Sequence, residues 1–251
     1  MGRADALGVL ERGRYVAHLA DHPSDLVAAQ SLRQLAFQAA APDQDRFDAC
    51  CDHILIRDRN STAVVGCFRA MVFPRGALIG RSYSAQFYGL EGLASFARPM
   101  MEIGRFCLHP GWRDPDILRL AWAAITRMVD AGGAHMLFGC SSFPGTDGAR
   151  YADAFAVLNA RHLAPVHWMP SIKSPQIAPF APAAGARAPD VVQAMRTLPP
   201  LLRSYLGMGG WVSDHAVIDA SLNTLHVFTG LEIASIPPAR VRALRLIAGG
   251  A

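Results

Sequence analysis

Apolar and polar residues recur along the chain with two different periods, and each period predicts one kind of secondary structure. Alternation with a period of two is typical of strands, and we expect strands over 13–20, 51–58, 62–73, 100–108, 134–143, 211–219 and 224–233. Spacing near 3.6 residues is typical of helices, and we expect helices over 22–40, 114–132, 190–209 and 237–249. Residues 82–90 predict a short extended stretch, and 91–99 predict a short helix.

The order of these elements predicts an α/β (α+β) layered fold, in which helices cover a central mixed, mostly antiparallel sheet. The clearest helix is expected to begin at Pro115, directly behind an Asp114 cap. We expect a core over 1–169 and, packed on the same domain, a C-terminal extension of helix and hairpin over 170–251. Within that extension, residues 170–189 are rich in proline and alanine and predict an extended excursion.

The composition describes a folded protein with a sizeable core. Hydrophobic residues make up 51% of the 251 residues and charged residues 18%, which excludes a disordered chain. The sequence has no apolar run of the roughly 18–20 residues that cross a bilayer. Its first twenty residues contain Asp5 and Glu11 and lack the apolar core of a secretion signal. We therefore expect a cytoplasmic location.

Charge and cysteine content narrow the choice of partners. The formal net charge of +4 favours acidic partners, such as an anionic membrane face or an acidic carrier protein. Nucleic acid is not expected as a partner, because the sequence has no basic cluster and no known binding motif. The five cysteines have no CxxC pair and no zinc-ligand spacing, so we expect isolated thiols and no metal.

Charged residues also interrupt apolar runs on several successive elements, and this is the strongest functional signal. The expected helix over 22–40 carries Arg33 and Phe37, which are four residues apart and therefore share one face. The following segments carry Asp45, Asp48, Asp52, His53, Arg69, Glu102 and Arg105. Glu102 and Arg105 point to opposite faces of an ideal strand, unless a bulge that Gly104 would permit re-aims one of them.

The pattern Arg33-x3-Phe37, Asp45-Arg-Phe-Asp48, Arg69 and Glu102-Ile-Gly-Arg105 resembles the acyl-homoserine-lactone autoinducer synthases. Those are GNAT-fold enzymes that take acyl groups from acyl carrier protein. Four segments, DRFDACCDHILI, EIGRFCLHPGWRD, LFGCSSFPGTD and LPPLLRSYLGMGGWVSDHAVID, are similar to the bacterial L-ornithine Nα-acyltransferases of aminolipid synthesis. The last segment has no counterpart in the autoinducer synthases, and the four together span most of the chain.

This resemblance implies an acyltransferase of GNAT-like fold. It would transfer a (3-hydroxy)acyl group from acyl carrier protein to the α-amine of an amino acid, and L-ornithine is the first candidate for that amino acid. This reaction would be the first step of ornithine lipid synthesis. The alternatives are an autoinducer-type synthase, the same transfer to glutamine, glycine or lysine, and a non-catalytic lipid- or carrier-binding protein.

The expected helix start at Asp114 departs from GNAT enzymes that use acetyl-coenzyme A. Those enzymes cradle pyrophosphate with a glycine-rich turn at a helix N-terminus. Here the sequence reads HPGWRDPDIL, and the carboxylates of Asp114 and Asp116 would repel a pyrophosphate. We therefore expect no permanently bound cofactor and a donor carried on the phosphopantetheine of acyl carrier protein.

The resemblance also suggests a role for each candidate residue. Acylation of an α-amine needs a proton acceptor, and Glu102 is the first candidate, with Asp48 and His53 as further catalytic candidates. Arg69 and Arg105 would bind the carboxylate of the amino acid, although a packed ion-pair network is the alternative.

The remaining candidates would bind or enclose the substrates. Asp48 and Asp52 would hold the side-chain ammonium of ornithine, with Asp45 in the same acidic loop. Arg33 and Phe37 would order that loop over the site. Ser141 and Ser142 would meet the 3-hydroxyl of the acyl chain, unless they only cap the end of a strand.

The C-terminal segment 237–249 predicts a small basic amphipathic helix. Arg240, Arg242 and Arg245 alternate there with aliphatic residues, so we expect at most weak, salt-reversible contact with an anionic membrane. The alternative is a helix that packs on the domain and leaves its arginines exposed.

Overall fold

The computed structural model describes residues 7–39, 41–180 and 188–249, which form two compact units. The first unit comprises Met1–Val72, Met101–His135 and Ile236–Ala251, and the second comprises Phe73–Met100 and Met136–Ser235. The expected boundary near residue 170 does not coincide with this division. Residues 170–235 belong to the second unit together with 73–100 and 136–169, and only the last helix returns to the first unit.

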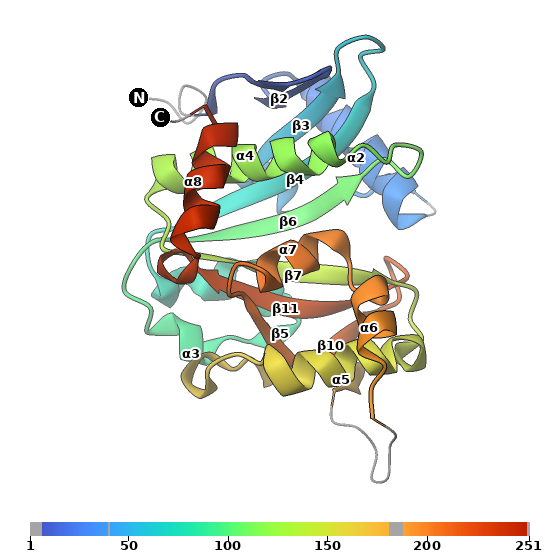
Figure 1. Ribbon diagram of the computed structural model, residues 1–251, viewed down its shortest axis with the longest axis vertical. Coiled ribbons are helices and arrows are strands. Elements are labelled where there is room, and N and C mark those ends of the chain that lie inside the picture. Colours follow the sequence, from blue (N-terminus) through green and yellow to red (C-terminus); the bar gives the residue numbers. More distant parts are fainter. Residues whose placement is uncertain (1–6, 40, 181–187, 250–251) are drawn as a thin grey trace. The chain divides into compact units, whose positions relative to one another are not determined.

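The first unit is a sheet with helices packed on it (Figure 1). Its strands follow the order β1-β2-β3-β4-β6, and β1 to β4 pair antiparallel with their sequence neighbours. The strands are β1 (Leu10–Arg12), β2 (Tyr15–Leu19), β3 (Asp52–Asp58), β4 (Val64–Phe73) and β6 (Met100–Leu108). The helices are α2 (Pro23–Phe37), the 3₁₀ helix η1 (Asp48–Cys50), α4 (Pro115–Gly132) and α8 (Pro238–Ile247).

Helix α4 shows how closely local sequence signals fix an element. The Asp114 carboxylate accepts the N–H of Asp116, Pro115 takes the first helical position, and Gly133 closes the helix with φ of +57°. That left-handed conformation suits glycine, which has no side chain to strain it. The helix buries Ile117 and Leu120 completely and contacts β1, β2, β3 and α8. Its predicted limits are confirmed.

The second unit contains the strand order β7-β11-β10-β9 and a separate pair, β5 with β8. Its strands are β5 (Tyr88–Gly89), β7 (Met136–Pro144), β8 (Ser171–Ile172), β9 (Ile177–Pro179), β10 (Trp211–Asp219) and β11 (Thr224–Glu232). Its α-helices are α3 (Glu91–Ala94), α5 (Ala152–Arg161), α6 (Val191–Thr197) and α7 (Pro200–Leu206). Its 3₁₀ helices are η2 (Gly76–Arg81), η3 (Ser84–Gln86), η4 (Gly148–Tyr151), η5 (Val166–Trp168) and η6 (Ile233–Ser235).

The core of the second unit lies where α5, α6 and α7 pack against β10 and β11. The fully buried residues Phe143, Leu158, Leu202, Val212 and Val227 belong to this core. Helix α5 is an addition to the predicted elements. The helix expected over 190–209 is two helices, because Pro199 and Pro200 force Leu198 into an extended conformation.

Two expectations fall partly outside the described residues. The excursion over 170–189 includes 181–187, and the helix expected over 22–40 includes residue 40. The described part of the excursion holds the short strands β8 and β9.

Helix α8 packs on α4 through its half-buried aliphatic side chains. Val241, Leu244 and Ile247 are half-buried, whereas Arg240 and Arg242 are exposed. Arg245 Nη2 lies 3.0 Å from an oxygen of Asp130 on α4. This packing fits the alternative expectation, a helix that rests on its own domain and leaves arginines exposed. In the described ranges, no helix combines the length and the hydropathy that a membrane crossing needs.

Candidate active site

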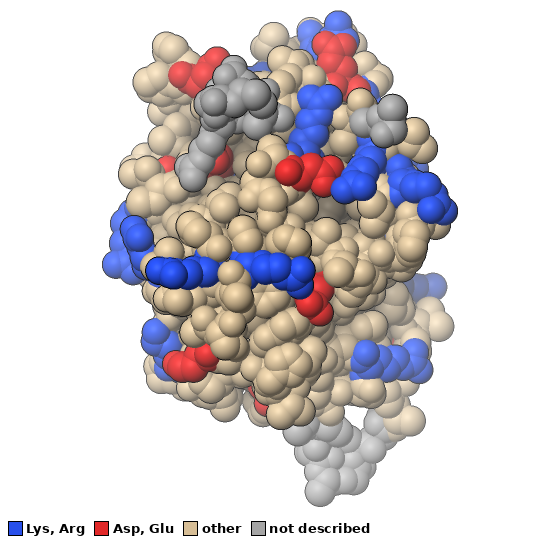
Figure 2. Space-filling model, turned by 90° about the vertical axis from the view of Figure 1, so that its left-hand side faces the viewer, with Lys and Arg blue, Asp and Glu red and all other residues tan. Residues whose placement is uncertain are grey.

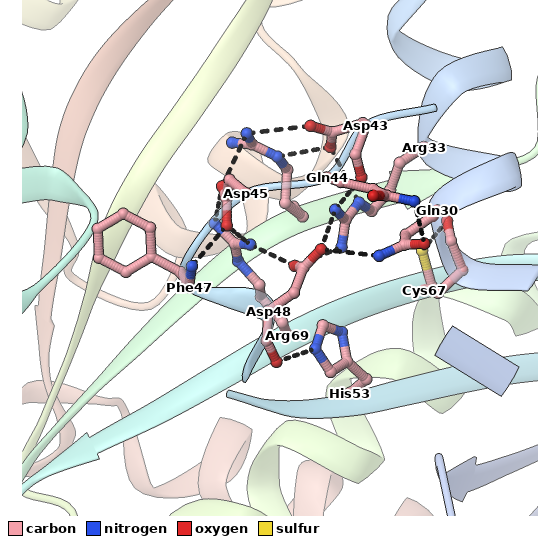
Figure 3. Close-up of polar contacts among 12 residues, drawn as sticks. Gln30, Arg33, Asp43, Gln44, Asp45, Phe47, Asp48, His53, Cys67 and Arg69 are labelled. Atoms are coloured by element: carbon pink, nitrogen blue, oxygen red, sulfur yellow. Dashed lines mark hydrogen bonds and ion pairs between the residues drawn. The ribbon is translucent and has the colours of Figure 1, made fainter. Parts of the chain in front are cut away.

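Most of the predicted site residues lie in the first unit, around a buried cluster of arginine and aspartate side chains (Figure 3). Helix α2 contributes Arg33, strand β4 contributes Arg69, and strand β6 contributes Arg105. The loop between α2 and β3 contributes the three carboxylates that these guanidinium groups contact, which are those of Asp43, Asp45 and Asp48. We call these six residues the arginine–aspartate cluster.

Arg33 is the most deeply buried member, with 1% of its surface exposed. Its Nε donates to Asp43 Oδ2 at 2.9 Å, and its Nη1 and Nη2 donate to the two oxygens of Asp48, also at 2.9 Å. Its Nη2 also donates to the backbone carbonyl of Asp43. Arg33 thereby contacts both ends of the acidic loop.

Arg69 joins the middle of the loop to the sheet. Its Nη1 donates at 2.6 Å both to Asp45 Oδ1 and to Asp48 Oδ1, and its Nη2 donates to Asp45 Oδ2 at 2.8 Å. The guanidinium also lies 5.7 Å from the ring centroid of Phe47, within the range of a cation–π contact. A bidentate fork of this kind fixes the position of a carboxylate as well as its charge.

Arg105 reaches the cluster because the backbone of β6 is irregular at this point. Its φ is +51°, a left-handed value that residues with side chains rarely adopt. The burial pattern along β6 does not alternate: Met100–Ile103 are buried and Gly104–Phe106 are half-buried. Arg105 Nε donates to Asp43 Oδ2 at 2.6 Å, and its Nη2 lies 3.2 Å from Asp45 Oδ2. The irregularity that Gly104 was expected to permit is therefore present and is centred on Arg105.

The electrostatic environment keeps the carboxylates of Asp45 and Asp48 ionised. Burial alone would raise the pKa of Asp48, but hydrogen bonds from Arg33, Gln30 and Arg69 hold it far below the usual range. The pKa of Asp45 is also lowered, because Arg69 and Arg105 outweigh the effect of burial. A carboxylate with so low a pKa is a poor proton acceptor, so the geometry disfavours Asp48 as the general base.

The contacts of Arg69 and Arg105 match the alternative foreseen for them, a packed ion-pair network. Both guanidinium groups already bind carboxylates of the chain itself. Asp45 is the most accessible of these carboxylates, since 21% of its side chain is exposed, compared with 6% for Asp43 and 7% for Asp48. A substrate group can therefore approach the cluster most easily at Asp45.

His53 and Glu102 lie beside the cluster. His53 Nε2 is 2.9 Å from the backbone carbonyl of Asp48, so this nitrogen carries the proton and donates it. Burial lowers the pKa of His53, which keeps the ring neutral at neutral pH. Glu102 on β6 is only 4% exposed, and its charge helps to raise the pKa of the neighbouring Cys51. The main cause of that rise, to about 12, is burial, so the Cys51 thiol is a poor nucleophile at this site.

The other predicted residues are placed as follows. Asp52 begins β3, where it lies opposite Ala70 of β4. Phe37 packs on a buried apolar group that includes Leu32, Cys67 and Cys107. Ser141 and Ser142 belong to β7 in the second unit, where Ser141 Oγ accepts a hydrogen bond from Thr229 Oγ1 at 3.0 Å.

Two residues of the site, Asp43 and Gln30, were not among the predicted site residues. Asp43 binds Arg33 and Arg105, and Gln30 donates to Asp48 Oδ2 at 3.0 Å. The signal for Gln30 was its position three residues before Arg33 on the same helix face. Among the described residues, no group of three or more His, Cys, Asp or Glu side chains is arranged to hold a metal ion.

The backbone amides at the start of α4 are hydrogen-bonded within the chain. Pro115 has no N–H, Asp116 N donates to Asp114 Oδ1 at 2.9 Å, and Ile117 N donates to the Asp114 carbonyl at 3.2 Å. In the preceding turn, Gly111 N donates to the ring of His109 at 3.1 Å. A helix start whose amides are engaged in this way offers few donors to a phosphate.

The carboxylates at this helix start are themselves paired. Asp116 accepts from Arg12 and Arg119, both at 2.8 Å, and Asp114 accepts from the hydroxyl of Tyr15 at 3.0 Å. Their charge is therefore partly offset. The charge repulsion predicted from the sequence is correspondingly reduced, whereas the engaged amides remain unavailable.

The sheet with flanking helices is the architecture of a GNAT-type acyltransferase. In agreement, an acetyltransferase (GNAT) domain model matches residues 29–123. The chain belongs to the L-ornithine Nα-acyltransferase family. It is 31% identical to the L-ornithine N(alpha)-acyltransferase of Rhodobacter capsulatus over 230 residues, which cover 85% of this chain and 88% of the relative.

Other relatives extend this comparison. The L-ornithine N(alpha)-acyltransferase of Agrobacterium fabrum is 27% identical, with 89% of this chain and 83% of the relative covered. Among solved structures, an N-acyl amino acid synthase from uncultured soil microbes matches with a TM-score of 0.49 and 10% identity. That match covers 94% of this chain and 97% of the other.

Proposed function

We propose that this protein transfers an acyl group from acyl carrier protein to the α-amine of L-ornithine. The observation that carries the proposal is the 31% identity, over most of both chains, to a relative named for this acceptor. The product would be an N-acylated ornithine, a lyso-aminolipid, and 3-hydroxyacyl chains are the donors that we expect. Acylation of ornithine would then be the first step in the synthesis of an ornithine lipid.

The chemistry is a direct transfer between two substrates. The neutral α-amine attacks the thioester carbonyl, a C–N bond forms, the C–S bond breaks, and the pantetheine thiol leaves with a proton. The ammonium form of ornithine must first lose a proton, and Glu102 is the residue that we assign to accept it, directly or through water. Glu102 is buried, with 4% of its surface exposed, on the same strand as Arg105.

The irregular stretch of β6 would stabilise the oxyanion that forms in this attack. Where a strand leaves its regular pairing, backbone N–H groups become available to a ligand. The stretch Gly104–Phe106 follows Glu102 by two residues, so the assigned base and these amides belong to one segment.

The accessible edge of the arginine–aspartate cluster would receive the charged groups of ornithine. Asp45 stays ionised and is the most exposed of the three carboxylates, so an ammonium group can pair with it. Asp52, which is half-buried at the start of β3, is the second acidic candidate. The buried carboxylates of Asp43 and Asp48 would hold the cluster together.

A carrier-bound donor is supported by the start of α4. Its first-turn amides are engaged within the chain, and Asp114 and Asp116 stand where a pyrophosphate would need bare donors. A phosphopantetheine arm on a carrier protein places no pyrophosphate there. The net positive charge of the chain would also favour an acidic carrier.

On the face drawn in Figure 2, Lys and Arg side chains lie in several separate groups, with Asp and Glu near some of them.

A radiochemical assay with purified protein tests the proposal. Acyl carrier protein loaded with one acyl chain is mixed in turn with labelled ornithine, lysine, glutamine and glycine, and the organic phase is counted. We expect label to enter the organic phase with ornithine, and the Glu102→Gln variant to lose most of this transfer. Equal transfer to another of these amino acids, or none to ornithine, would overturn the assignment of the acceptor.

The donor is tested separately. The same acyl chain is supplied either on acyl carrier protein or on coenzyme A, and kcat/KM is compared at low and high salt. We expect the carrier to be preferred and its kcat/KM to fall as salt rises, because pairing between opposite charges is screened. Equal kcat/KM for both donors would contradict the argument from the helix start.

A further inference from the structure

Within the first unit, the carboxylate of Asp45 accepts hydrogen bonds at both of its oxygens (Figure 3). Oδ1 accepts from Arg69 Nη1 at 2.6 Å and from the backbone N–H of Phe47 at 2.8 Å. Oδ2 accepts from Arg69 Nη2 at 2.8 Å and from Arg105 Nη2 at 3.2 Å. We call these four donors the four-donor site. Donors arranged in this way fit any carboxylate, whether it belongs to the chain or to a ligand.

The present occupant of the four-donor site lies between the donors and the solvent. The side chain of Asp45 is 21% exposed, whereas the side chains of Arg69 and Arg105 are only 2% and 9% exposed. A ligand that approaches the two guanidinium groups from solvent therefore meets Asp45 first. Asp45 occupies the place that a carboxylate of the ligand would take.

The two guanidinium groups do not depend on Asp45 for their charge balance. Arg69 Nη1 also donates to Asp48 Oδ1 at 2.6 Å, and Arg105 Nε also donates to Asp43 Oδ2 at 2.6 Å. Each arginine thus keeps a carboxylate of the chain if Asp45 leaves. The four-donor site would stay assembled during an exchange of its occupant.

The loop that carries Asp45 is anchored on both sides of this residue. Arg33 binds the carboxylates of Asp43 and Asp48, which lie before and after it in the sequence. An exchange would therefore need only a rotation of the Asp45 side chain. Side chains that are exposed to solvent make such rotations within nanoseconds.

The backbone of Arg105 is an independent sign of function in the four-donor site. Its φ of +51° is strained for a residue with a side chain, and strain of this kind clusters at ligand sites. Fold stability alone does not account for the strain, because a buried ion pair contributes little net stability. The strained residue brings a second guanidinium group to one carboxylate.

Charge balance defines the ligand. When one carboxylate replaces another, Arg69 and Arg105 keep the same number of negative partners. The displaced carboxylate of Asp45 then needs a cation, because a charged group near a protein interior is costly without a partner. A ligand that carries a carboxylate and an ammonium group meets both needs, whereas a simple anion meets only the first.

We propose that the four-donor site binds the α-carboxylate of the acceptor amino acid, which displaces the carboxylate of Asp45. The released Asp45 then pairs with an ammonium group of the same amino acid. Asp45 is thus a placeholder that fills the site between turnovers. This assignment rests on the proposed function, because it takes an amino acid as the acceptor.

The first test separates the two charged ends of ornithine. Norvaline is ornithine without its side-chain ammonium, and putrescine is ornithine without its α-carboxylate. Their binding to the wild type and to Asp45→Asn is measured by calorimetry without an acyl donor. Norvaline should bind the variant about 10- to 150-fold more tightly, because it no longer displaces a charged hydrogen-bond partner. Putrescine should bind the variant more weakly, because its ammonium loses a carboxylate.

The opposite signs distinguish an exchange from general damage to the site, which would weaken both ligands. Asp130→Asn is the matched control, since it removes a half-exposed carboxylate that pairs with Arg245 away from the cluster. That variant should bind both ligands as the wild type does. Thermal unfolding establishes that both variants are folded. Unchanged or weaker binding of norvaline to Asp45→Asn would overturn the proposal.

A second measurement needs no variant of the site. Norvalinamide has the shape of norvaline, but a neutral amide replaces its carboxylate. The wild type should bind norvaline at least about 10-fold more tightly than norvalinamide, since the amide cannot accept from all four donors. Equal affinities for the two compounds would overturn the proposal, even if Asp45→Asn did not fold.

The outcome is separable from that of the proposed function. If ornithine is not acylated but norvaline and putrescine respond with opposite signs, the assigned acceptor is wrong and the carboxylate site stands. If ornithine is acylated but norvaline gains nothing in Asp45→Asn, the proposed function stands and the exchange is wrong.

Discussion

Replacing Arg33 by methionine should destabilise the first unit more than any other single change in the arginine–aspartate cluster. Arg33 is 1% exposed and donates to the carboxylates of both Asp43 and Asp48. Methionine fills the space of the aliphatic stem but leaves both carboxylates without this partner. Breaking a buried ion pair in this way typically costs about 3–5 kcal/mol.

The contacts that remain place the expected value at the lower end of that range. Asp48 keeps its bonds to Gln30 and Arg69, and Asp43 keeps its bond to Arg105. A loss of about 3 kcal/mol in a chain of this length lowers the melting temperature by roughly 6–12 °C. Thermal unfolding at neutral pH, followed by circular dichroism, measures this shift directly.

An exposed arginine of the same unit supplies the matched control. Arg245 pairs with Asp130 at 3.0 Å, and both side chains are about half exposed, at 52% and 47%. Arg245→Met should change the melting temperature little, because solvent screens an exposed pair. If Arg33→Met melted together with Arg245→Met, the view of the cluster as a buried scaffold would be wrong.

Three further predictions concern catalysis, acid stability and membranes. Glu102→Gln should reduce kcat about 10²–10⁴-fold with the fold retained; a near wild-type rate would exclude Glu102 as the base. Because the pKa of Asp48 is lowered, its ion pairs stabilise the fold above the unfolded carboxyl pKa of about 3.9, and this stabilisation is lost as the pH falls further. In urea unfolding, acidification should therefore lower the free energy of unfolding less in Arg33→Met than in the wild type. The protein should pellet only weakly with phosphatidylglycerol vesicles, salt should reverse this, and the Arg240→Gln, Arg242→Gln double variant should pellet less. Equal pelleting of the double variant and the wild type would show that α8 does not contact lipid. Point changes are preferable to deletion of α8, since Arg127 donates to the Ala248 carbonyl at 2.8 Å.

Several elements could be predicted from the sequence because their signals are local. Strand β6 occupies Met100–Leu108 as expected, and α4 begins at Pro115 as expected. Cap residues and alternation depend only on neighbours along the chain, so they can be read without knowledge of the fold. The break between α6 and α7 was equally local, since the Pro199–Pro200 pair marks it.

Which side chains meet was decided only by the tertiary structure. The sequence places three arginines and several aspartates on successive elements, and many pairings satisfy that pattern. The folded chain selects one, in which Asp43 joins Arg33 of α2 to Arg105 of β6. This choice depends on which strands are neighbours and on the left-handed backbone of Arg105, and neither is encoded by periodicity.

Asp214 and His215 of β10 show the same limit in its sharpest form, since His215 Nδ1 lies 2.6 Å from Asp214 Oδ1 although the two residues are consecutive. Consecutive residues of a regular strand point to opposite faces, so the sequence alone places these two side chains apart. A bulge in β10 turns them toward each other. It forms because the register of β10 against β11 shifts between Val212, which pairs with Thr229, and Ala216, which pairs with Val227. Local sequence therefore determined the elements, and long-range pairing determined the sites, because a register is a property of two strands together.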